Sequence, residues 1–477
     1  MPEVSKVVED TLVKASEAAA VFTQLDQEHI DRIVRAVFEA GLSNRVKLAK
    51  MACEETGLGK LQDKIHKNVL ATLYVYNDIK RLKTVGVIAE DPVTGITEIA
   101  QPLGPILAVI PVTNPTSTTL FKILIAIKTR NPIIISAHHR ATNCCRETAR
   151  LCYEAALKED APENCIQYFD RGSREDTRAL MSDKRLALIL ATGGESVVKA
   201  AYSSGTPAIG VGAGNVPVFI EKTANIPFAV EQILLSKTFD NGTVCASEQA
   251  VVVEKAVAGQ VREELLKHHA YFLNTDEIKL LEKVAYDAEK HVMNANIIGQ
   301  PVSKIAEMAG LSKVPNDTKV LIAELDGVGD QYPLSSEILA PILAYYEANT
   351  FNKAVSLCID LNYHGGMGHT ASVFSNDDKK IKEFSLLMNA GRILVNMPSS
   401  HGAVGGMFNT LPTSFTLGCG SGGKNITTDN ITARHLLNIQ RICRRRTNER
   451  MSHLSEQMLF DETVDANVIE KAYNLNY

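Results

Sequence analysis

The N-terminal part of the chain carries apolar residues at the three- and four-residue spacing of amphipathic helices. The strongest stripe lies between residues 29 and 41 and comprises Ile30, Ile33, Val34 and Val37. A second helical segment, NRVKLAKMACEETG, ends at Gly57, and a weaker stripe at the start comprises Val4, Val8 and Leu12. Such helices either pack on their own domain, which is the more common arrangement, or act as docking segments for a partner or a protein shell.

From residue 86 onward, the pattern changes to short apolar runs rich in β-branched residues. The first four are ILAVIPV, NPIIISA, NCIQYFD and LALILAT, and the stretches between them hold one helix each, around residues 120–128, 145–157 and 174–181. Continuous apolar strands that alternate with helices predict a parallel sheet covered on both faces. Such sheets bind ligands beyond the carboxyl ends of their strands. The candidate binding loops are therefore residues 111–117, 136–141, 169–175 and 191–201.

A second α/β unit is predicted from about residue 226. The helix-like segment PFAVEQILLSKTF leads to a loop that contains Cys245 and then to the strand AVVVE. Further strand-like runs follow a long helical region, namely KVLIAEL, ILAYYE, TASVFS and RILVNM. Residues 398–424 are rich in glycine and apolar residues and carry few charges. That composition is typical of a loop that lies over a site.

The composition predicts an ordinary cytoplasmic protein of two or three subdomains. The 477 residues exceed what one hydrophobic core usually accommodates, and 45% hydrophobic with 22% charged residues is close to the globular average. No apolar run approaches the roughly 20 residues that a membrane span requires. The N-terminus lacks the basic start and apolar core of a secretory signal. We therefore expect no membrane association.

Charge and cysteine usage narrow the classes of partner. The net charge of −5 gives no global basic field for nucleic acid, and the local cluster Arg444, Arg445 and Arg446 is interpreted as a solvated face. The nine cysteines are an odd number without CxxC pairs or a His/Cys cluster. This pattern argues against disulfides and against a metal site. Reduced thiols are expected.

Several segments follow one another as they do in a known enzyme family, namely FDNGTVCASEQ, GVGAGNVPVFI, SSEILAPIL, GHTASVFS and TLGCGSGGKN. In them the chain resembles the CoA-acylating branch of the aldehyde dehydrogenase superfamily, above all the aldehyde dehydrogenase half of the bifunctional aldehyde-alcohol dehydrogenases. The resemblance runs from about residue 20 to about residue 445. It implies an α/β fold with a Rossmann-type NAD-binding domain at residues 1–225, which includes a small oligomerisation arm near 86–101. A catalytic domain at 226–415 and a C-terminal lid, oligomerisation segment and tail at 416–477 complete the expected organisation.

The resemblance gives Cys245 the role of nucleophile. A thiolate that adds to an aldehyde makes the carbonyl carbon tetrahedral, and the resulting oxyanion can then expel hydride toward a nicotinamide. The family's oxyanion donor matches Asn114 in PVTNP, with the backbone N–H of Cys245 as second donor; the alternative is an Asn-Pro turn residue. His369 in GMGHT matches a residue near the family's site, although a lone histidine is more often structural.

Cofactor contacts are expected at the ends of the strands. Glu337 in EILAP matches the glutamate that binds the nicotinamide ribose, with a surface carboxylate as the alternative. The loops supply further candidates, namely Thr113, His138, Gly193, Gly194 and Gly212. Glycines at a helix N-terminus admit a pyrophosphate to the backbone amides. Near relatives use NAD, but SAHHRA lacks the acid that favours a free 2′-hydroxyl, so NADP stays an alternative.

One departure from the hydrolytic family members bears on the reaction. Those enzymes have a glutamate, a leucine and two glycines where this chain reads GVGAGN, and the glutamate activates water. Val211 and Gly212 cannot act as a base, so CoA is the expected acyl acceptor and acyl-CoA the expected product. A hydrolytic aldehyde dehydrogenase and a non-catalytic assembly module remain alternatives. We expect a homodimer or larger homo-oligomer, with association with a filament or a microcompartment as a further hypothesis.

The glycine-rich segment also raises a hypothesis about the substrate. The bifunctional enzymes usually carry a tryptophan after the serine of this segment, where the present chain has Gly422, followed by the cationic Lys424. If both lie near the acyl or CoA channel, they favour a bulkier or anionic aldehyde, such as a semialdehyde or a sulfonated aldehyde.

Overall fold

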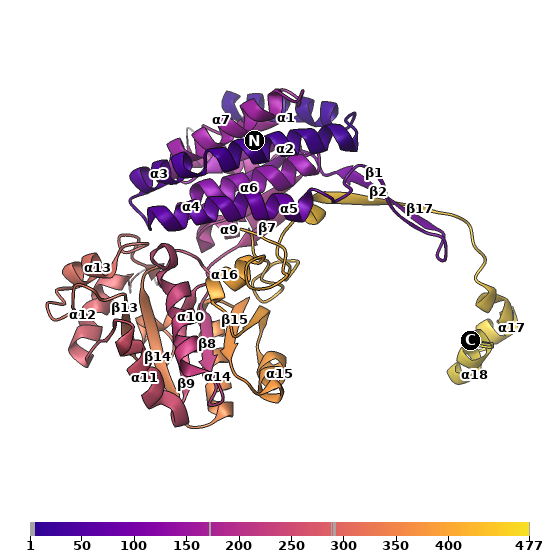
Figure 1. The fold of residues 1–477 in the computed structure, drawn as a ribbon. Coiled ribbons are helices and arrows are strands. Elements are labelled where there is room, and N and C mark those ends of the chain that lie inside the picture. Colours follow the sequence, from indigo (N-terminus) through magenta and orange to yellow (C-terminus); the bar gives the residue numbers. More distant parts are fainter. Residues whose placement is uncertain (1–4, 171–172, 288, 290–291, 477) are drawn as a thin grey trace.

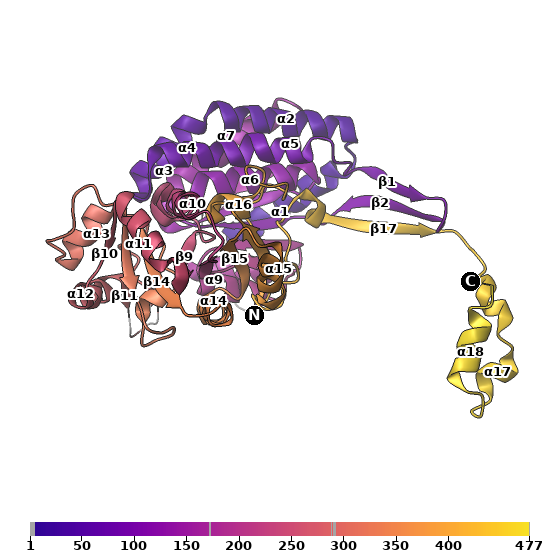
Figure 2. The same cartoon turned by 60° about the horizontal axis from the view of Figure 1, so that its bottom comes forward.

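The computed structural model describes residues 5–170, 173–287, 289 and 292–476. Two parallel sheets with helices on both faces form the body, and a narrow antiparallel arm extends from it to the C-terminal helices (Figure 1). Figure 2 shows the same arm standing clear of the body from a second direction. No helix among the described residues is both long enough and apolar enough to cross a membrane. The predicted α/β architecture with parallel sheets is confirmed.

The first sheet has the strand order β5-β4-β3-β6-β7, and every neighbouring pair is parallel. Its strands are β3 (Ile106–Ile110), β4 (Ile133–Ala137), β5 (Ile166–Tyr168), β6 (Leu188–Thr192) and β7 (Ala208–Val211). The four apolar runs predicted as strands form β3, β4, β5 and β6. The chain reverses its winding direction beside β3, and the loops after β3 and β6 therefore meet at the carboxyl edge of the sheet.

Helices cover both faces of this sheet because alternate strand residues point to opposite sides. Leu107, Ile134 and Ile189 pack against α1, α8 and α9, whereas Ile106, Ala108 and Ile133 pack against α2, α6 and α7. Val8 and Leu12 of α1 are fully buried in the first of these layers. The N-terminal helix therefore packs on its own domain, while Val4 lies outside the described residues. The helices of this part are α1 (Lys6–Phe22), α2 (Gln27–Ser43), α3 (Arg45–Thr56), α4 (Leu61–Val69), α5 (Val75–Ile79), α6 (Pro115–Lys128), α7 (Thr142–Leu157), α8 (Arg174–Ser182) and α9 (Glu195–Tyr202).

The second sheet has seven parallel strands in the order β10-β13-β14-β9-β8-β15-β16. They are β8 (Val216–Ile220), β9 (Glu248–Glu254), β10 (Ala270–Phe272), β13 (Val320–Glu324), β14 (Ile342–Ala348), β15 (Gly368–Phe374) and β16 (Ala390–Val395). Each strand-like run predicted after Cys245 forms one of them. Strand β8 joins this sheet although it precedes residue 226, so the chain crosses between the sheets at residues 212–215; the domain boundaries remain predictions.

The helices of the second sheet also form two layers. Helices α10 (Ile226–Thr238) and α11 (Ala258–Lys267) pack against Val218, Val251 and Leu343. The opposite face packs against α12 (Thr275–Ala285), α13 (Val302–Ala309), α14 (Phe351–Gly365) and α15 (Asp378–Leu387). The short helix α16 (Ser399–Val404) opens the glycine-rich segment. Short helical turns occur in both parts of the body, namely η1 (Leu70–Tyr74) and η2 (His139–Ala141) in the first, and η3 (Phe239–Gly242), η4 (Lys255–Val257) and η5 (Pro333–Ser335) in the second.

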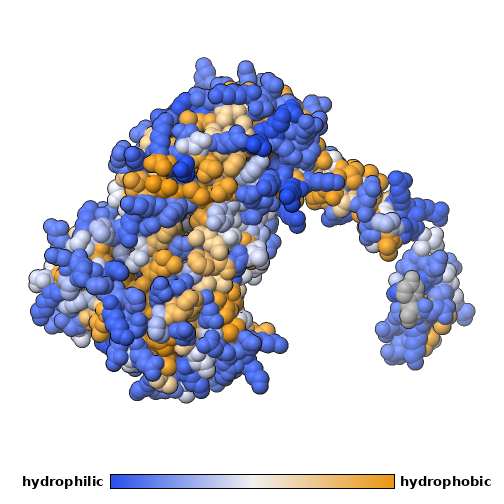
Figure 3. All heavy atoms as spheres, viewed as in Figure 1, coloured by the Kyte–Doolittle hydropathy of each residue, from blue (hydrophilic) through white to orange (hydrophobic). Residues whose placement is uncertain are grey.

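The arm is an antiparallel sheet of order β1-β2-β17, formed by β1 (Gly86–Asp91), β2 (Ile96–Pro102) and β17 (Leu437–Cys443). It carries exposed apolar side chains, among them Val87, Val93 and Ile442, and Figure 3 shows hydrophobic surface along it. Beyond it lie η7 (Glu449–His453), α17 (Glu456–Phe460) and α18 (Ala466–Tyr473). The remaining elements are η6 (Ala433–Leu436) and the pair β11 (Tyr286–Asp287) and β12 (Val292–Met293). Sequence reasoning placed the arm at residues 86–101, and its third strand comes from the C-terminal region.

Candidate active site

Cys245 lies between η3 and β9, where its side chain is partly exposed to a pocket between the two sheets. The lining surface is mainly apolar, and Asn114 and Lys67 are among the seven polar side chains that contribute to it. The lining comprises Lys67, Leu70, Asn114, Thr118, Thr192, Val211, Phe239, Val244, Cys245, Ser400, His401, Val404, Ser414, Phe415 and Leu417. Six of the other cysteines are buried, and Cys245 differs from them in opening onto this pocket.

The backbone before Cys245 adopts a conformation that only a few residue types tolerate. Asp240 and Asn241 both have left-handed dihedrals, with φ of 49° and 54°, and Gly242 follows with φ of 75°. Asn and Asp are the side chains most often found in this region, and glycine has no penalty there. A Cβ atom on Gly242 would also lie 2.8 Å from the carbonyl oxygen of Ala340. The letters DNG therefore allow a tight reversal that places Cys245 over the pocket.

The thiol of Cys245 is protonated at neutral pH in this environment. Burial, together with the carboxylate of Glu337 and the thiol of Cys419, raises its pKa to about 12, and the guanidinium of Arg392 acts in the opposite direction. The nucleophilic thiolate is therefore a minor species until a base or a positive charge in the pocket stabilises it. Sequence reasoning left the activating group open.

Glu337 is half-buried and lies beside Cys245. Its Oε1 accepts a hydrogen bond from the backbone N–H of Gly214 at 2.8 Å, and burial raises the pKa of its carboxyl to about 7. The segment that carries it is fixed by Gln249, whose Oε1 accepts from Ile338 N at 3.0 Å and from Lys237 Nζ at 2.9 Å. The surface-carboxylate alternative does not fit this burial, and the ribose role of Glu337 remains a prediction.

The segment GVGAGN forms the wall behind Cys245. A Cβ atom on Gly214 would lie 2.3 Å from the carbonyl oxygen of Cys245, so glycine is required for this close approach of two backbones. Val211 contributes its side chain to the pocket, and a Cβ atom on Gly212 would meet no atom within 4 Å. The hydrolytic members of the superfamily have a glutamate in this segment, and the corresponding wall here is apolar.

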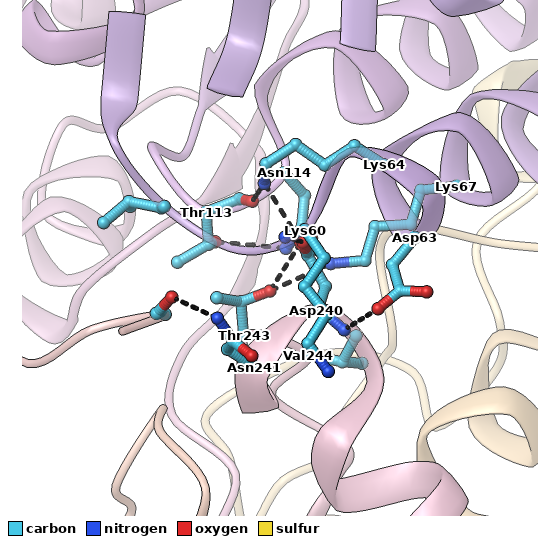
Figure 4. Close-up of polar contacts among 12 residues, drawn as sticks. Lys60, Asp63, Lys64, Lys67, Thr113, Asn114, Asp240, Asn241, Thr243 and Val244 are labelled. Carbon is cyan, nitrogen blue, oxygen red and sulfur yellow. Dashed lines mark hydrogen bonds and ion pairs between the residues drawn. The ribbon is translucent and has the colours of Figure 1, made fainter. Parts of the chain in front are cut away.

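Asn114 precedes α6 and faces the same pocket as Cys245. Its Oδ1 accepts from Lys67 Nζ at 2.6 Å, and its Nδ2 donates to Thr113 Oγ1 at 3.0 Å (Figure 4). The side chain makes no capping bond to helix α6. An Asn-Pro turn explains the backbone at this position, but it does not explain a side chain held by a lysine in the pocket wall.

The structure places His369 behind the backbone of the site. The side chain is fully buried, its Nδ1 is 2.9 Å from Thr370 Oγ1, and its ring lies against Gly214. Burial lowers its pKa to about 3, assisted by the positive charge of Arg392, so the imidazole is neutral at physiological pH. His369 is not among the side chains that line the pocket. Its participation in catalysis remains a prediction.

The cofactor candidates gather at the carboxyl edge of the first sheet. Thr113 follows β3, His138 follows β4 and caps η2, and Gly193 and Gly194 lie between β6 and α9. A Cβ atom on Gly194 would meet nothing within 4 Å. The hydroxyl of Thr192 is buried, lines the pocket and has no hydrogen-bond partner among the described residues. Open glycine backbone and an unpaired hydroxyl fit a dinucleotide whose phosphates meet the N-terminus of α9.

The glycine-rich segment closes the pocket from the other side. Ser400 and His401 of α16 and Phe415 in the following loop contribute to its lining. Burial lowers the pKa of His401 to about 4, and the charges of Lys67 and His66 act in the same direction. Gly422 instead packs against Met367, and neither it nor Lys424 lines the pocket. The pocket geometry therefore gives no support to an anionic aldehyde held by Lys424.

A buried charge cluster beneath Asn114 escaped the sequence reasoning. It consists of Lys64 and Lys67 of α4 and Asp240, of which the carboxylate is fully buried. The lysines are three residues apart on a helix, and Asp240 lies five residues before Cys245. An i, i+3 lysine pair on a helix normally indicates a solvated face, so the sequence offers no signal that this pair is buried. Among the described residues, no group of side chains could hold a metal ion.

Comparison with known proteins gives this arrangement a context. The aldehyde dehydrogenase family profile matches residues 3–284, more than half of the chain. The chain belongs to the aldehyde dehydrogenase family. An aldehyde-alcohol dehydrogenase of Clostridium acetobutylicum is 44% identical over 447 residues, which cover 93% of this chain and 51% of the relative. The chain thus spans about half the length of the first curated relatives it matches.

Solved structures of the aldehyde dehydrogenase family share the whole body of the fold. An acetylating aldehyde dehydrogenase from Geobacillus thermoglucosidasius is 44% identical with a TM-score of 0.90, and the match covers 92% of this chain and 96% of that one. A propionaldehyde dehydrogenase from Rhodopseudomonas palustris, solved with bound CoA and an acylated cysteine, is 26% identical with a TM-score of 0.82 and covers 92% and 97%. The resemblance to the CoA-acylating branch of aldehyde dehydrogenases is confirmed.

Proposed function

We propose that this aldehyde dehydrogenase oxidises an aldehyde to an acyl-CoA, with NAD as the electron acceptor and CoA as the acyl acceptor. One observation carries the proposal: Cys245 opens onto a mainly apolar pocket together with Asn114. In the segment GVGAGN beside it, neither Val211 nor Gly212 can act as the base that a hydrolytic enzyme needs. The relatives support it, since one is named as acetylating and another holds CoA and an acylated cysteine.

The first half of the reaction uses Cys245 and Asn114. The thiolate sulfur of Cys245 forms a bond to the aldehyde carbon, and the π electrons of the carbonyl move to its oxygen. The free N–H of Asn114 and the backbone N–H of Cys245 are the donors that we assign to this oxygen. When the C=O bond reforms, the hydride leaves the carbon and a thioester remains on Cys245. A bound nicotinamide would supply the hydride acceptor for this step.

The second half of the reaction, transfer of the acyl group to CoA, depends on the lack of a water-activating base in the pocket lining. Val211, Val244 and Leu417 contribute apolar side chains to the pocket, and none of the described residues that line it is a carboxylate that could activate water. The thiol of CoA attacks the thioester carbon, the bond to the Cys245 sulfur breaks, and the cysteine is released as the leaving group. The proton of the CoA thiol passes to the released sulfur of Cys245, and because this exchange replaces one thioester by another, it is reversible.

The pocket favours small uncharged aldehydes. Apart from Lys67, whose charge is compensated by Asp240, the ionisable side chains in its lining are His401, which is neutral, and Cys245. Phe239, Phe415 and Leu70 limit its size. We therefore propose a short aliphatic aldehyde such as acetaldehyde as the substrate. NAD is proposed over NADP from the resemblance to the near relatives.

The assembly proposal rests on the arm. Its exposed apolar side chains and the unpaired outer edges of β1 and β17 support a homodimer or a larger homo-oligomer of the family type. The reduced cysteines support the cytoplasm as the compartment.

One experiment tests the proposed reaction. NADH formation is followed with a panel of aldehydes, with and without CoA, for the wild type, Cys245→Ala and the control Cys419→Ala. We expect CoA-dependent NADH formation by the wild type and by Cys419→Ala, and none by Cys245→Ala. NADH formation that does not require CoA would identify a hydrolytic enzyme instead, and activity in Cys245→Ala would refute the nucleophile.

A further inference from the structure

The cluster of Lys64, Lys67 and Asp240 lies under the residue that we assign to the oxyanion. The two ammonium groups lie 3.0 and 2.6 Å from the same carboxylate oxygen, Asp240 Oδ2, and all three side chains are at least 97% buried. Figure 4 shows both lysines reaching from α4 towards this carboxylate. A second carboxylate, that of Asp63, accepts from the backbone N–H of Asp240 at 2.7 Å. Burial of these charged groups is costly unless each is paired.

Every donor of Lys67 has a defined acceptor. Its Nζ donates to Asp240 Oδ2 at 2.6 Å, to Thr243 Oγ1 at 2.9 Å and to Asn114 Oδ1 at 2.6 Å. An ammonium group has three donors and no acceptor. All three donors of the Lys67 ammonium group are therefore satisfied, and one of the three hydrogen bonds goes to the side chain of Asn114.

The bond from Lys67 decides which way the carboxamide of Asn114 points. Because an ammonium group offers no acceptor, only the oxygen of the amide can face it. The Nδ2 group therefore lies on the opposite side; one of its hydrogens goes to Thr113 Oγ1, and the other is available to the pocket. If Lys67 were absent, a flip of the amide would place its oxygen, a hydrogen-bond acceptor, where the negative oxygen of the substrate forms.

Asp240 in turn holds Lys67 in place. Its Oδ1 accepts from Lys60 N at 2.7 Å, and its own backbone N–H donates to Asp63 Oδ2 at 2.7 Å. A Cβ atom on Gly59 would lie 1.9 Å from Asp240 Oδ1, so a glycine admits the carboxylate at this point. The left-handed backbone of Asp240 belongs to the reversal that delivers Cys245. The same short segment thus sets the position of the nucleophile and, through Lys67, the orientation of Asn114.

We propose that Lys67 is a positioning residue for the oxyanion site: held by Asp240, it fixes the Asn114 carboxamide with an N–H towards the pocket. The proposal rests on the roles of Cys245 and Asn114 in the proposed function. It does not depend on which cofactor or acyl acceptor is used.

The test uses two reactions of Cys245 that need neither NAD nor CoA. Acylation by p-nitrophenyl acetate passes through a tetrahedral oxyanion, whereas alkylation by iodoacetamide displaces iodide and forms none. Both rates are measured for the wild type, Lys67→Met, Asn114→Ala and the double variant. We expect Lys67→Met and Asn114→Ala each to lower the acylation rate by about 10²-fold, in the range found when one oxyanion donor is lost. Alkylation is expected to stay within about twofold in all of them.

The double variant shows whether Lys67 acts by positioning Asn114 or contributes to acylation independently of it. If Lys67 acts through Asn114, adding Lys67→Met to Asn114→Ala lowers acylation little further. Losses that multiply, or an alkylation rate that falls as much as the acylation rate, would overturn the proposal. Lys64→Met is the matched control, since Lys64 shares the helix, the burial and the Asp240 contact but donates to the carbonyl oxygen of Thr113 at 3.1 Å instead of to Asn114. Any loss of acylation rate caused by Lys64→Met should therefore multiply with the loss caused by Asn114→Ala.

Two further measurements keep the outcome decisive. Asp240→Asn preserves the shape of the carboxylate but weakens its ion pair with Lys67. It should lower the acylation rate and leave the alkylation rate unchanged, as expected for Lys67→Met. It is therefore used in place of Lys67→Met if that variant does not fold. The wild type is also assayed for CoA-dependent NADH formation. If that activity is absent while the acylation pattern holds, the proposed function fails and the positioning role stands. If the activity is present and the pattern is absent, only the positioning role fails.

Discussion

The carboxylate of Glu337 accepts a hydrogen bond from the backbone N–H of Gly214 at 2.8 Å, and Gly214 lies directly against the carbonyl group of Cys245. The loop that carries Glu337, the candidate for the ribose contact, is therefore connected through Gly214 to the backbone of the nucleophile Cys245. A substitution of Glu337, Gly214 or Cys245 should therefore alter the position of the other two residues.

Gly214→Ala should destabilise the protein and slow the reaction of Cys245. The added methyl group would lie 2.3 Å from the carbonyl oxygen of Cys245. Overpacking of this kind typically costs about 1–3 kcal/mol. Urea denaturation measures the free energy of unfolding, with Gly212→Ala as the control for stability because its added Cβ meets nothing within 4 Å. Equal unfolding free energies for both variants would contradict the close approach.

Glu337→Gln should make Cys245 more reactive towards iodoacetamide above pH 7. After burial, the Glu337 carboxylate is the largest influence that raises the pKa of Cys245, and removing its charge lowers that pKa. The pKa of Glu337 itself is raised by burial to about 7, with Lys237 as the nearby counter-charge, so the difference from the wild type should vanish at pH 5. The pH profile of alkylation measures this, with the exposed Glu347→Gln as control. Slower alkylation at every pH would instead identify Glu337 as the base that deprotonates Cys245.

Arg392 should couple the glycine-rich segment to the nucleophile. Its guanidinium donates to His369 O at 2.8 Å, to Asn430 Oδ1 at 2.7 Å and to the carbonyl groups of Thr428 and Gly418. Arg392→Met leaves these acceptors unpaired and removes a positive charge that lowers the pKa of Cys245. We expect faster proteolysis within residues 418–430 and slower alkylation of Cys245.

The conservative variant of Arg392 separates these two effects. Arg392→Lys keeps the charge but not the fork of donors, so it should restore the alkylation rate and leave the segment sensitive to protease. Full restoration of both properties by lysine would show that charge alone matters.

Lys67 should make the stability of the protein depend on pH in the alkaline range. Burial lowers its pKa from an ordinary 10.5 to about 8, even though Asp240 and Asp63 act in the opposite direction and Lys64 adds to the decrease. Between pH 8 and 10.5, the folded protein therefore binds fewer protons at Lys67 than the unfolded chain, and the free energy of unfolding rises with pH. Below pH 8 the lysine is charged in both states and its contribution is constant.

The comparison with Lys67→Met isolates this term. Urea denaturation at pH 8, 9 and 10 should show a rise in the wild type that is missing or smaller in the variant, because methionine does not titrate. Parallel curves for the two proteins would mean that the ammonium of Lys67 is solvated in solution.

Phe415→Ala should shift the preference towards longer aldehydes. Phe415 lines the pocket that contains Cys245, and truncation enlarges the space available to the alkyl chain. One methylene in an apolar pocket is typically worth 10- to 200-fold in kcat/KM, so the ratio for hexanal over acetaldehyde should rise by about tenfold or more. Phe408→Ala is the control, since Phe408 is exposed and lies outside the lining. An unchanged ratio would place the acyl chain elsewhere.

The local hydrophobic pattern was sufficient to predict the elements whose apolar residues follow a regular helix or strand spacing. The β-branched runs at 106–112 and 131–137 became β3 and β4, and the stripe of Ile30, Ile33, Val34 and Val37 became the buried face of α2. The third strand of the arm was harder to place, because β17 pairs with β2 across more than three hundred residues of chain. No local signal encodes such a pairing.

The sequence by itself determined the family, the nucleophile candidate Cys245 and the absence of a carboxylate in GVGAGN, because these depend on residue identity and order. Only the tertiary structure decided that Lys67 and Asp240, far apart in the chain, meet under Asn114, and that His369 lies behind Gly214 and not in the pocket. Burial and partner contacts arise when the two sheets pack together, and they set the direction of a side chain and its pKa. The same lysine is a surface charge in the sequence pattern and a buried anchor in the folded protein.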